Sequence, residues 1–156
     1  MANAGVIDGG DLMLYAEITT GTMTLIGDAK SHKMTTSSEV RTRRTKSTGD
    51  FPGRKVTGLD AQVTTDCLVT YDGVGYYDLL DLWNQKKDVK LKLAGHNEAT
   101  LGTKEAAGDK YVELTCVIDS LDINADNDDD VSFTATFSVN GDATAPFAIK
   151  TVTTGT

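Results

Sequence analysis

The stretch KVTGLDAQVTTDCLVTYDGVGYYDLLDLWNQKKDVKLKLAG, residues 55–95, contains three patterned segments in a row. In the first segment every second residue is apolar or nearly so: Leu59, Ala61, Val63, Thr65, Cys67 and Val69. Because side chains alternate between the two faces of a strand, this pattern predicts a strand with one face in a core. The opposite, polar face carries Asp60, Gln62, Thr64 and Asp66.

The second segment predicts an amphipathic helix at about residues 75–87. Its apolar residues recur at i, i+3, i+4 and i+7, the spacing of one helical face. We expect this stripe to pack on the core, and its members are Tyr76, Leu79, Leu80 and Trp83. Acidic residues in the early turns and lysines in the last one complement the helix dipole. Residues 89–93 alternate again, and a sheet covered by one helix is the simplest fold that buries all three apolar surfaces.

The length and charge of the chain limit its function. With 156 residues, it is expected to form a single domain, residues 1–156, that buries roughly 70% of its unfolded surface without metals or disulfides. The net charge of -8 argues against a surface that grips nucleic acid, although an acidic wall that DNA passes without adhering remains compatible with it. Cys67 and Cys116 occupy apolar-phase positions, which favours buried free thiols over a disulfide.

The beginning of the sequence has neither the cationic region nor the apolar region of a signal peptide. No segment approaches the ~18 apolar residues of a membrane span. We therefore expect a soluble protein that folds in a cytoplasm and has no membrane partner.

The rest of the chain predicts more strands, connected by polar segments. Strands are expected at residues 12–18, 23–27, 28–42, 112–118 and 131–139, and residues 120–124 are expected to continue the fourth of these after a kink or bulge. We expect flexible arms at residues 1–10 and 142–156. The second arm contains an apolar patch, Phe147 and Ile149, that has no place in the expected core.

A long basic loop is predicted at residues 41–55, RTRRTKSTGDFPGRK, because no core pattern runs through it. It is either a solvated hairpin tip or a loop that becomes ordered on contact with an acidic partner. Phe51 stands alone among polar residues, which favours the second interpretation slightly.

Common functional sites do not fit the sequence. Asp126, Asp128 and Asp130 resemble the start of a calcium loop, but Val131 stands where that loop needs glycine. The two histidines have no second ligand at zinc spacing. No nucleophile, phosphate or dinucleotide motif is present, so we expect no cofactor, no metal and no enzymatic activity. A small carbohydrate-binding β sandwich remains an alternative.

The order of these parts resembles the major tail tube proteins of long-tailed phages and the inner-tube subunits of contractile injection systems. The resemblance spans residues 11–141: an opening hairpin, a long polar loop, the strand ending CLVTYDG, the helix YYDLLDLWNQK, the strand VKLKLAG and the closing VELTCVIDSLDINADNDDDVSFTATFSVNG. The C-terminal arm is not part of the usual pattern.

The resemblance implies a β sandwich or barrel of antiparallel strands with one flanking helix. It also implies a structural virion protein, in which hexameric rings close by edge-to-edge β pairing and stack into a hollow tail tube that conducts the genome. The implied partners are further copies of the chain, the tape measure, tail terminator and baseplate or initiator proteins, and DNA passing without specific binding. The implied location is the virion tail, assembled in the host bacterial cytoplasm.

Two charged surfaces suggest how such rings would stack. Six basic residues and Asp50 give residues 41–55 a charge of +5, whereas six aspartates give residues 119–130 a charge of -6. Opposite charges favour head-to-tail contact and fix its register. We hypothesise an inter-ring contact of Arg41, Arg43, Arg44, Lys46, Phe51, Arg54 and Lys55 with Asp126, Asp128, Asp129 and Asp130. Asp60, Gln62, Thr64 and Asp66 are candidates for a lumen or inter-subunit face.

Overall fold

The structure is a computed structural model that describes residues 5, 12–19, 22–26, 29–47, 49–71, 75–95, 108–144 and 146–152. The described residues form one helix, α1 (Tyr76–Asn84), and a mainly β fold, as expected. The strands are β1 (Leu12–Thr19), β2 (Thr22–Leu25), β3 (Ala29–Arg43), β4 (Gly53–Leu68), β5 (Val89–Gly95), β6 (Lys110–Asn124), β7 (Ser132–Val139) and β8 (Phe147–Thr151). The arm expected at residues 1–10 lies, apart from Gly5, outside the described residues.

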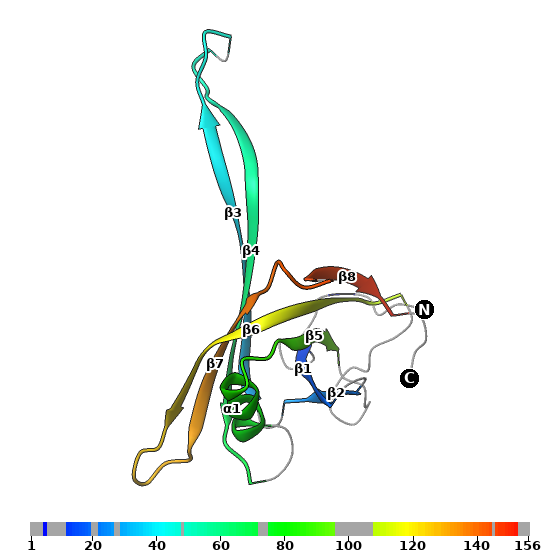
Figure 1. Cartoon of the computed structure of the whole chain (residues 1–156), viewed down its shortest axis with the longest axis vertical. Helices are drawn as coiled ribbons and strands as arrows, with labels where there is room; N and C mark the ends of the chain where they lie inside the picture. Colours follow the sequence, from blue (N-terminus) through cyan, green and yellow to red (C-terminus); the bar gives the residue numbers. More distant parts are fainter. Residues whose placement is uncertain are drawn as a thin grey trace.

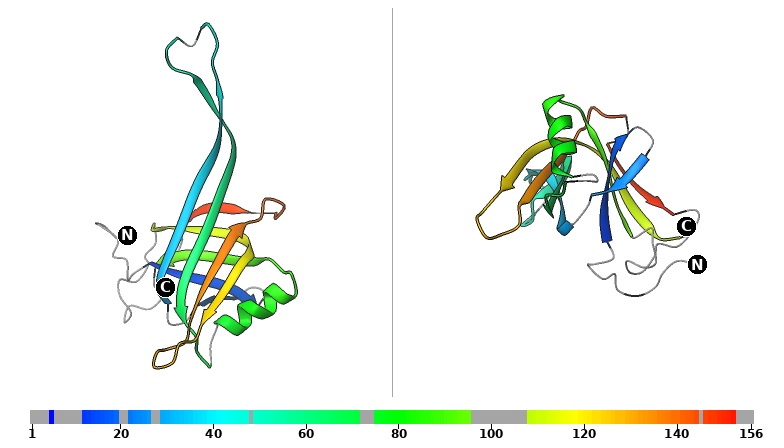
Figure 2. Two further views of the ribbon diagram at one scale, coloured as in Figure 1. Left: turned by 90° about the vertical axis from the view of Figure 1, so that its left-hand side faces the viewer. Right: turned by 90° about the horizontal axis from the view of Figure 1, so that it is seen from below.

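The strands form one antiparallel sheet in the order β2-β1-β5-β6-β7-β4-β3, and β8 pairs with β6 as well (Figure 1). The sheet ends at β2 and at β3, so it does not close into a barrel. This corrects the barrel part of the expected architecture. The sheet instead curls until its two halves face each other across a core, and Figure 2 shows the halves crossing.

Strand β6 belongs to both halves of the sheet. Residues 110–116 pair with β5 and β8, while residues 116–124 pair with β7. The register shifts between Ile118 and Ser120, which makes Asp119 an extra residue in the ladder. Such a β-bulge bends a strand and increases its twist. The kink expected in this strand is therefore confirmed, and it is where the sheet turns from one half to the other.

The core lies between the two halves of the sheet. Its fully buried side chains include Leu14, Leu91 and Leu114 from one half and Val63, Phe133 and Phe137 from the other. The predicted alternation in β4 is confirmed from Ala61 to Cys67. Leu59 does not follow it, because its side chain is 83% exposed. The core ends before this residue, as described below.

Helix α1 packs against the core through one narrow side. Leu79 is fully buried, and the ring of Tyr76 lies 5.6 Å from that of Phe133. Asp78 accepts a hydrogen bond from the Gly75 N–H at 3.2 Å, one half of a capping box at the N-terminus of the helix.

The expected helix stripe is only partly correct. Trp83 is 51% exposed and Leu80 is half-buried, whereas Leu82 packs against the core. The buried side therefore follows residues 76, 79 and 82, because the helix meets the sheet along one flank of the predicted stripe. The helix also ends at Asn84, so Lys86 and Lys87 lie beyond its last turn.

Both cysteines are free and buried, as favoured from the sequence. Burial, and to a lesser extent the negative charge of Asp88, raises the pKa of the Cys116 thiol to about 12. A thiol of this kind stays protonated near neutral pH and reacts poorly, since the thiolate is the nucleophile.

The C-terminal segment is not entirely an arm, which corrects a further expectation. Residues 147–151 form β8 along β6, and Lys150 forms an ion pair with Glu113 at 2.6 Å. Thr115 joins β7 and β8, since its C=O accepts from the Asn140 N–H and its own N–H donates to the Pro146 C=O. β8 thus continues the ladder that β7 begins on the same edge of β6.

We predict that Phe137→Ala lowers the free energy of unfolding by about 3–5 kcal/mol, because it removes a fully buried aromatic ring and leaves a cavity. Thr136→Ala, on the opposite face of the same strand, is the matched control and is expected to cost less than about 1 kcal/mol. Urea unfolding measures both changes. Equal losses would contradict the assignment of the two faces.

Candidate functional site

A long hairpin projects from the body of the protein (Figure 1). β3 and β4 pair from Ala29 opposite Cys67 to Arg43 opposite Gly53. Sixteen residues of β4, at about 3.3 Å per residue, extend about 50 Å. β7 pairs only with residues 62–68 of β4, so the distal part of the hairpin has no neighbouring strand. We call residues 37–60 the hairpin arm.

The basic loop is shorter than the sequence suggested. Residues 41–43 end β3 and residues 53–55 begin β4, so the irregular segment is limited to residues 44–52. It is the tip of a hairpin, one of the two interpretations considered above. Arg44 donates from Nη2 to the Asp50 C=O at 2.6 Å and so closes the turn. Phe51 follows directly, and its side chain is 80% exposed.

The two faces of the hairpin arm differ in character. The register shifts between Glu39, opposite Gly58, and Val40, opposite Val56. The extra residue in β4 places Leu59 and Val56 on the same face, next to Val40. All three are exposed, at 83%, 55% and 46% respectively. The other face carries the cations of Arg41, Arg43 and Lys55.

Four strand segments form a continuous polar face on the side of the sheet away from the core. These are β3, β4, β7 and residues 117–124 of β6. Thr64 has Lys33 on one side and Thr136 on the other. The same pairings give further polar members: Ser31, Thr35 and Ser37 of β3, Asp60, Gln62 and Asp66 of β4, Thr134 and Ser138 of β7, and Asp119, Ser120, Asp122 and Asn124 of β6. They also place one apolar residue, Val117 of β6, on this face, opposite Ser138.

Side-chain hydrogen bonds connect the strands across this polar face. Thr134 Oγ1 donates to Asp66 Oδ1 at 2.7 Å. The carboxylate of Asp119 accepts from Ser138 at 3.2 Å and from Gln62 at 3.4 Å. The members named above include four carboxylates and one lysine, so their net charge is -3. The four candidate lumen residues thus lie on one face, which also includes residues of β3, β6 and β7 that the sequence did not place there.

The four-stranded segment has two edges without a partner among the described residues. One is the outer edge of β3, and the other is the edge of β6 at residues 117–124, opposite β7. Neither stretch contains proline, so every residue has an N–H to donate. Unpaired strand edges in monomers are usually covered or interrupted, and long open ones serve as templates for another strand.

A cleft of about 350 Å³ lies where β4 ends, opposite to the hairpin tip. Its lining is mostly apolar and aromatic: Leu68, Val69, Thr70, Tyr71, Tyr77, Ile123, Asp130 and Val131. Tyr71 is fully exposed and Tyr77 is 64% exposed. The acidic turn, residues 125–131, joins β6 to β7 here and contributes Asp130 to the lining.

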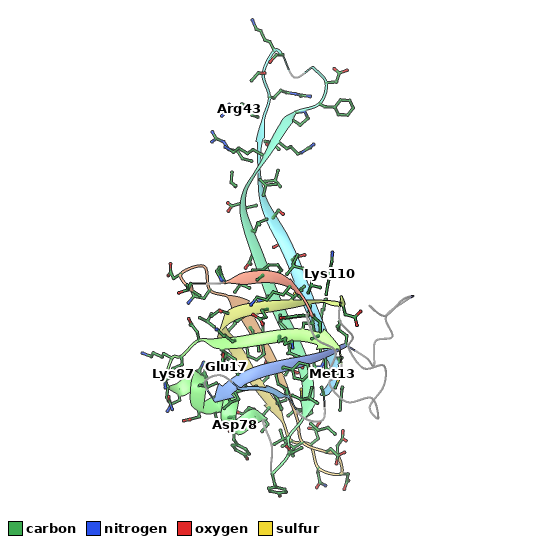
Figure 3. The ribbon with its side chains drawn as sticks, turned by 90° about the vertical axis from the view of Figure 1, so that its right-hand side faces the viewer. Met13, Glu17, Arg43, Asp78, Lys87 and Lys110 are labelled. Carbon is green, nitrogen blue, oxygen red and sulfur yellow. The ribbon has the colours of Figure 1, made fainter. Side chains whose placement is uncertain are left out.

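The structure does not bring the two predicted inter-ring surfaces together within one subunit. Asp126, Asp128 and Asp129 lie on the exposed acidic turn, and the basic residues lie at the far end of β3 and β4. In Figure 3, Arg43 lies on the projecting hairpin, while Asp78 of α1 lies at the other end of the molecule. A contact between the two surfaces therefore requires two copies.

Neither a metal-binding cluster nor a membrane-spanning helix occurs among the described residues. No group of three or more His, Cys, Asp or Glu side chains could hold a metal ion in that part of the chain. No helix within the same residues is long and apolar enough to cross a membrane.

The fold is that of tail tube subunits. A chain in the tail of an empty gene transfer agent particle, refined helically with C6 symmetry, matches with a TM-score of 0.67 and 13% identity, covering 94% of this chain and 99% of that one. A chain of the native gene transfer agent virion matches with a TM-score of 0.62 and 11% identity, and the coverage of both chains is the same. The SPP1 tail tube gives 0.71 and 11%, covering 95% of this chain and 81% of that one.

No family model matches the sequence, and no curated protein matches it either. The similarity to these structures therefore concerns the fold, and it confirms at that level the resemblance inferred from the order of parts.

Two features of the site were missed in the sequence. The apolar face of the hairpin arm was one, although Val56 and Leu59 differ in phase, which is the signal of a bulge between them. The cleft was the other. Its lining comes from the ends of β4, β6 and α1, which no local pattern connects.

Proposed function

We propose that the protein is a structural subunit of a phage-type tail tube. Six copies close into a ring, and rings stack into a hollow tube that conducts the genome. The observation that carries this proposal is the polar face of four strands, bounded on both sides by edges that have no partner among the described residues. The C6 symmetry of the similar gene transfer agent tail supports the number of copies.

In this proposal the ring closes when β3 of one subunit pairs with residues 117–124 of β6 in the next. Each subunit offers both edges, so the contact is heterologous and repeats around the ring. The polar faces then form one continuous inner wall. Backbone hydrogen bonds satisfy both of these edges in the ring.

Stacking in this proposal joins the basic hairpin tip of one subunit to the acidic turn of a subunit in the next ring. The contacting residues are Arg41, Arg43, Arg44, Lys46, Phe51, Arg54 and Lys55 on one side and Asp126, Asp128, Asp129 and Asp130 on the other. The two groups lie at opposite ends of the subunit, which is the arrangement that an open head-to-tail filament needs. An inner tube of a contractile injection system would use the same surfaces.

Other partners follow from the same role. The tape measure would occupy the lumen during assembly, the tail terminator would cap one end of the tube, and a baseplate or initiator complex would provide the first ring. The virion tail is the proposed location, and the host cytoplasm is the proposed place of assembly. The proposed function requires no enzymatic activity.

The direct experiment is negative-stain microscopy of the concentrated protein. We expect rings or tubes of uniform width. Particles that remain monomeric at all concentrations, and also in the presence of preformed tube ends, would contradict the proposal.

A charge reversal tests the stacking contact. Arg41→Glu with Arg43→Glu leaves the turn contact of Arg44 intact, and we expect it to prevent tube growth at low salt while the far-UV spectrum is unchanged. Lys86→Glu with Lys87→Glu makes the same change in net charge beyond the helix and is the control. Normal tubes from the first variant would contradict the contact.

The lumen assignment predicts how assembled tubes treat DNA. Wild-type tubes are expected not to retain double-stranded DNA at moderate salt, because the polar face is negative. Asp60→Lys with Asp122→Lys changes the charge of that face from -3 to +1, and we expect such tubes to retain DNA until salt is raised. Filter binding measures both. Asp81→Lys with Asp142→Lys is the control, and tight binding by wild-type tubes would contradict the assignment.

A further inference from the structure

The exposed aromatic ring at the hairpin tip and the cleft at the other end of the subunit have complementary properties. Phe51 is 80% exposed between two turn residues, an unfavourable place for an apolar ring in water. The volume of the cleft, about 350 Å³, is ample for a benzyl group. The walls of the cleft combine apolar and aromatic side chains with the polar Thr70 and Asp130, and an inserted ring would gain contacts with Tyr71 and Tyr77.

The charges around the two features match as well. Arg44 and Lys46 precede Phe51 along the tip, and Arg54 follows it. The acidic turn borders the cleft, and Asp130 belongs to both. A ring inserted into the cleft would therefore bring the cations of the tip against the carboxylates of the turn.

The two features cannot meet within one molecule. The tip precedes β4 and the cleft begins at its last residue, Leu68, so about 50 Å of extended strand separates them. The hydrogen bond from Arg44 to the Asp50 C=O fixes the turn next to Phe51, whose side chain is exposed. Phe51 can therefore reach the cleft only of another copy.

We propose that Phe51 is the anchor of ring stacking and that its side chain fills the cleft lined by Tyr71, Tyr77, Ile123 and Val131 of a subunit in the next ring. This inference rests on the proposed tube function. It adds an apolar contact that provides the affinity between stacked rings. Exposed ion pairs contribute little each, whereas a buried aromatic anchor in a pocket commonly dominates an interface. The surrounding charges then set orientation and register.

Cross-linking between two variants that each carry one added cysteine tests the contact of Phe51 with the cleft. Phe51→Cys and Ile123→Cys are prepared separately, mixed, assembled and treated with a short bifunctional maleimide. Cys67 and Cys116 are buried in the folded chain and do not interfere. We expect covalent dimers in the mixture and none in either variant alone. Lys87→Cys, exposed beyond the end of α1, replaces Phe51→Cys in the control mixture and is expected to give none.

Truncation of the Phe51 side chain tests how much it contributes to tube growth. Phe51→Ala is expected to raise the critical concentration for tube growth at least about tenfold and to leave single rings intact, whereas Phe51→Leu keeps an apolar side chain and loses less. Circular dichroism checks that the fold is unchanged, which is expected for a residue so exposed.

The outcomes separate this inference from the function beneath it. Absence of rings and tubes from the wild-type protein contradicts both. Tubes that form normally with Phe51→Ala, or tubes of the mixed variants without cross-links, contradict the anchor and leave the tube function standing. If Phe51→Ala impairs tube growth but Phe51→Cys does not cross-link to Ile123→Cys, the Phe51 side chain binds a different surface. That result also contradicts the proposed contact with the cleft.

Discussion

The hydrophobic core supports only part of the longest strand in the molecule. β4 contacts the core from Ala61 onward, where β7 lies beside it and the opposite half of the sheet lies beneath it. Before this residue the ribbon of β3 and β4 continues without a supporting layer. A two-stranded ribbon is marginally stable in water on its own, and Val40, Val56 and Leu59 are exposed on it. In the proposed tube, neighbouring subunits are available to cover this surface.

The second constraint, besides the unsupported ribbon of β3 and β4, concerns the polar face of the sheet. A sheet in a monomer buries one face and exposes the other, and a polar exposed face is ordinary. Here the same four-stranded segment also has two long edges without a partner among the described residues, at β3 and β6. The proposed ring accounts for both features together, because edge pairing would remove the two edges and turn the polar faces toward a common interior. In the same proposal, head-to-tail stacking uses the hairpin tip and the cleft.

The sequence predicted the local structure well where a core was present. The alternation of β4 after Ala61, the bulge of β6 near Asp119 and the existence of α1 all follow from nearest-neighbour patterns. It failed where burial depended on distant contacts. Trp83 belongs to a helical stripe by spacing, but only the flank containing Leu79 and Leu82 meets the sheet. The pairing of β8 with β6 depends on a junction at Thr115 that no short segment encodes.

The candidate site shows the same division. The charged members of the tip and of the acidic turn were visible as runs of like charge, and the polar face of β4 was visible as alternate residues. Their arrangement at opposite ends of one strand could be seen only in the fold.

The most direct test is a helical reconstruction of assembled protein by electron cryomicroscopy. The account predicts sixfold rings in which β3 pairs with β6 of the neighbour and Asp60, Gln62, Thr64 and Asp66 line an open lumen. A lumen lined by α1, or subunits joined without strand pairing, would contradict it.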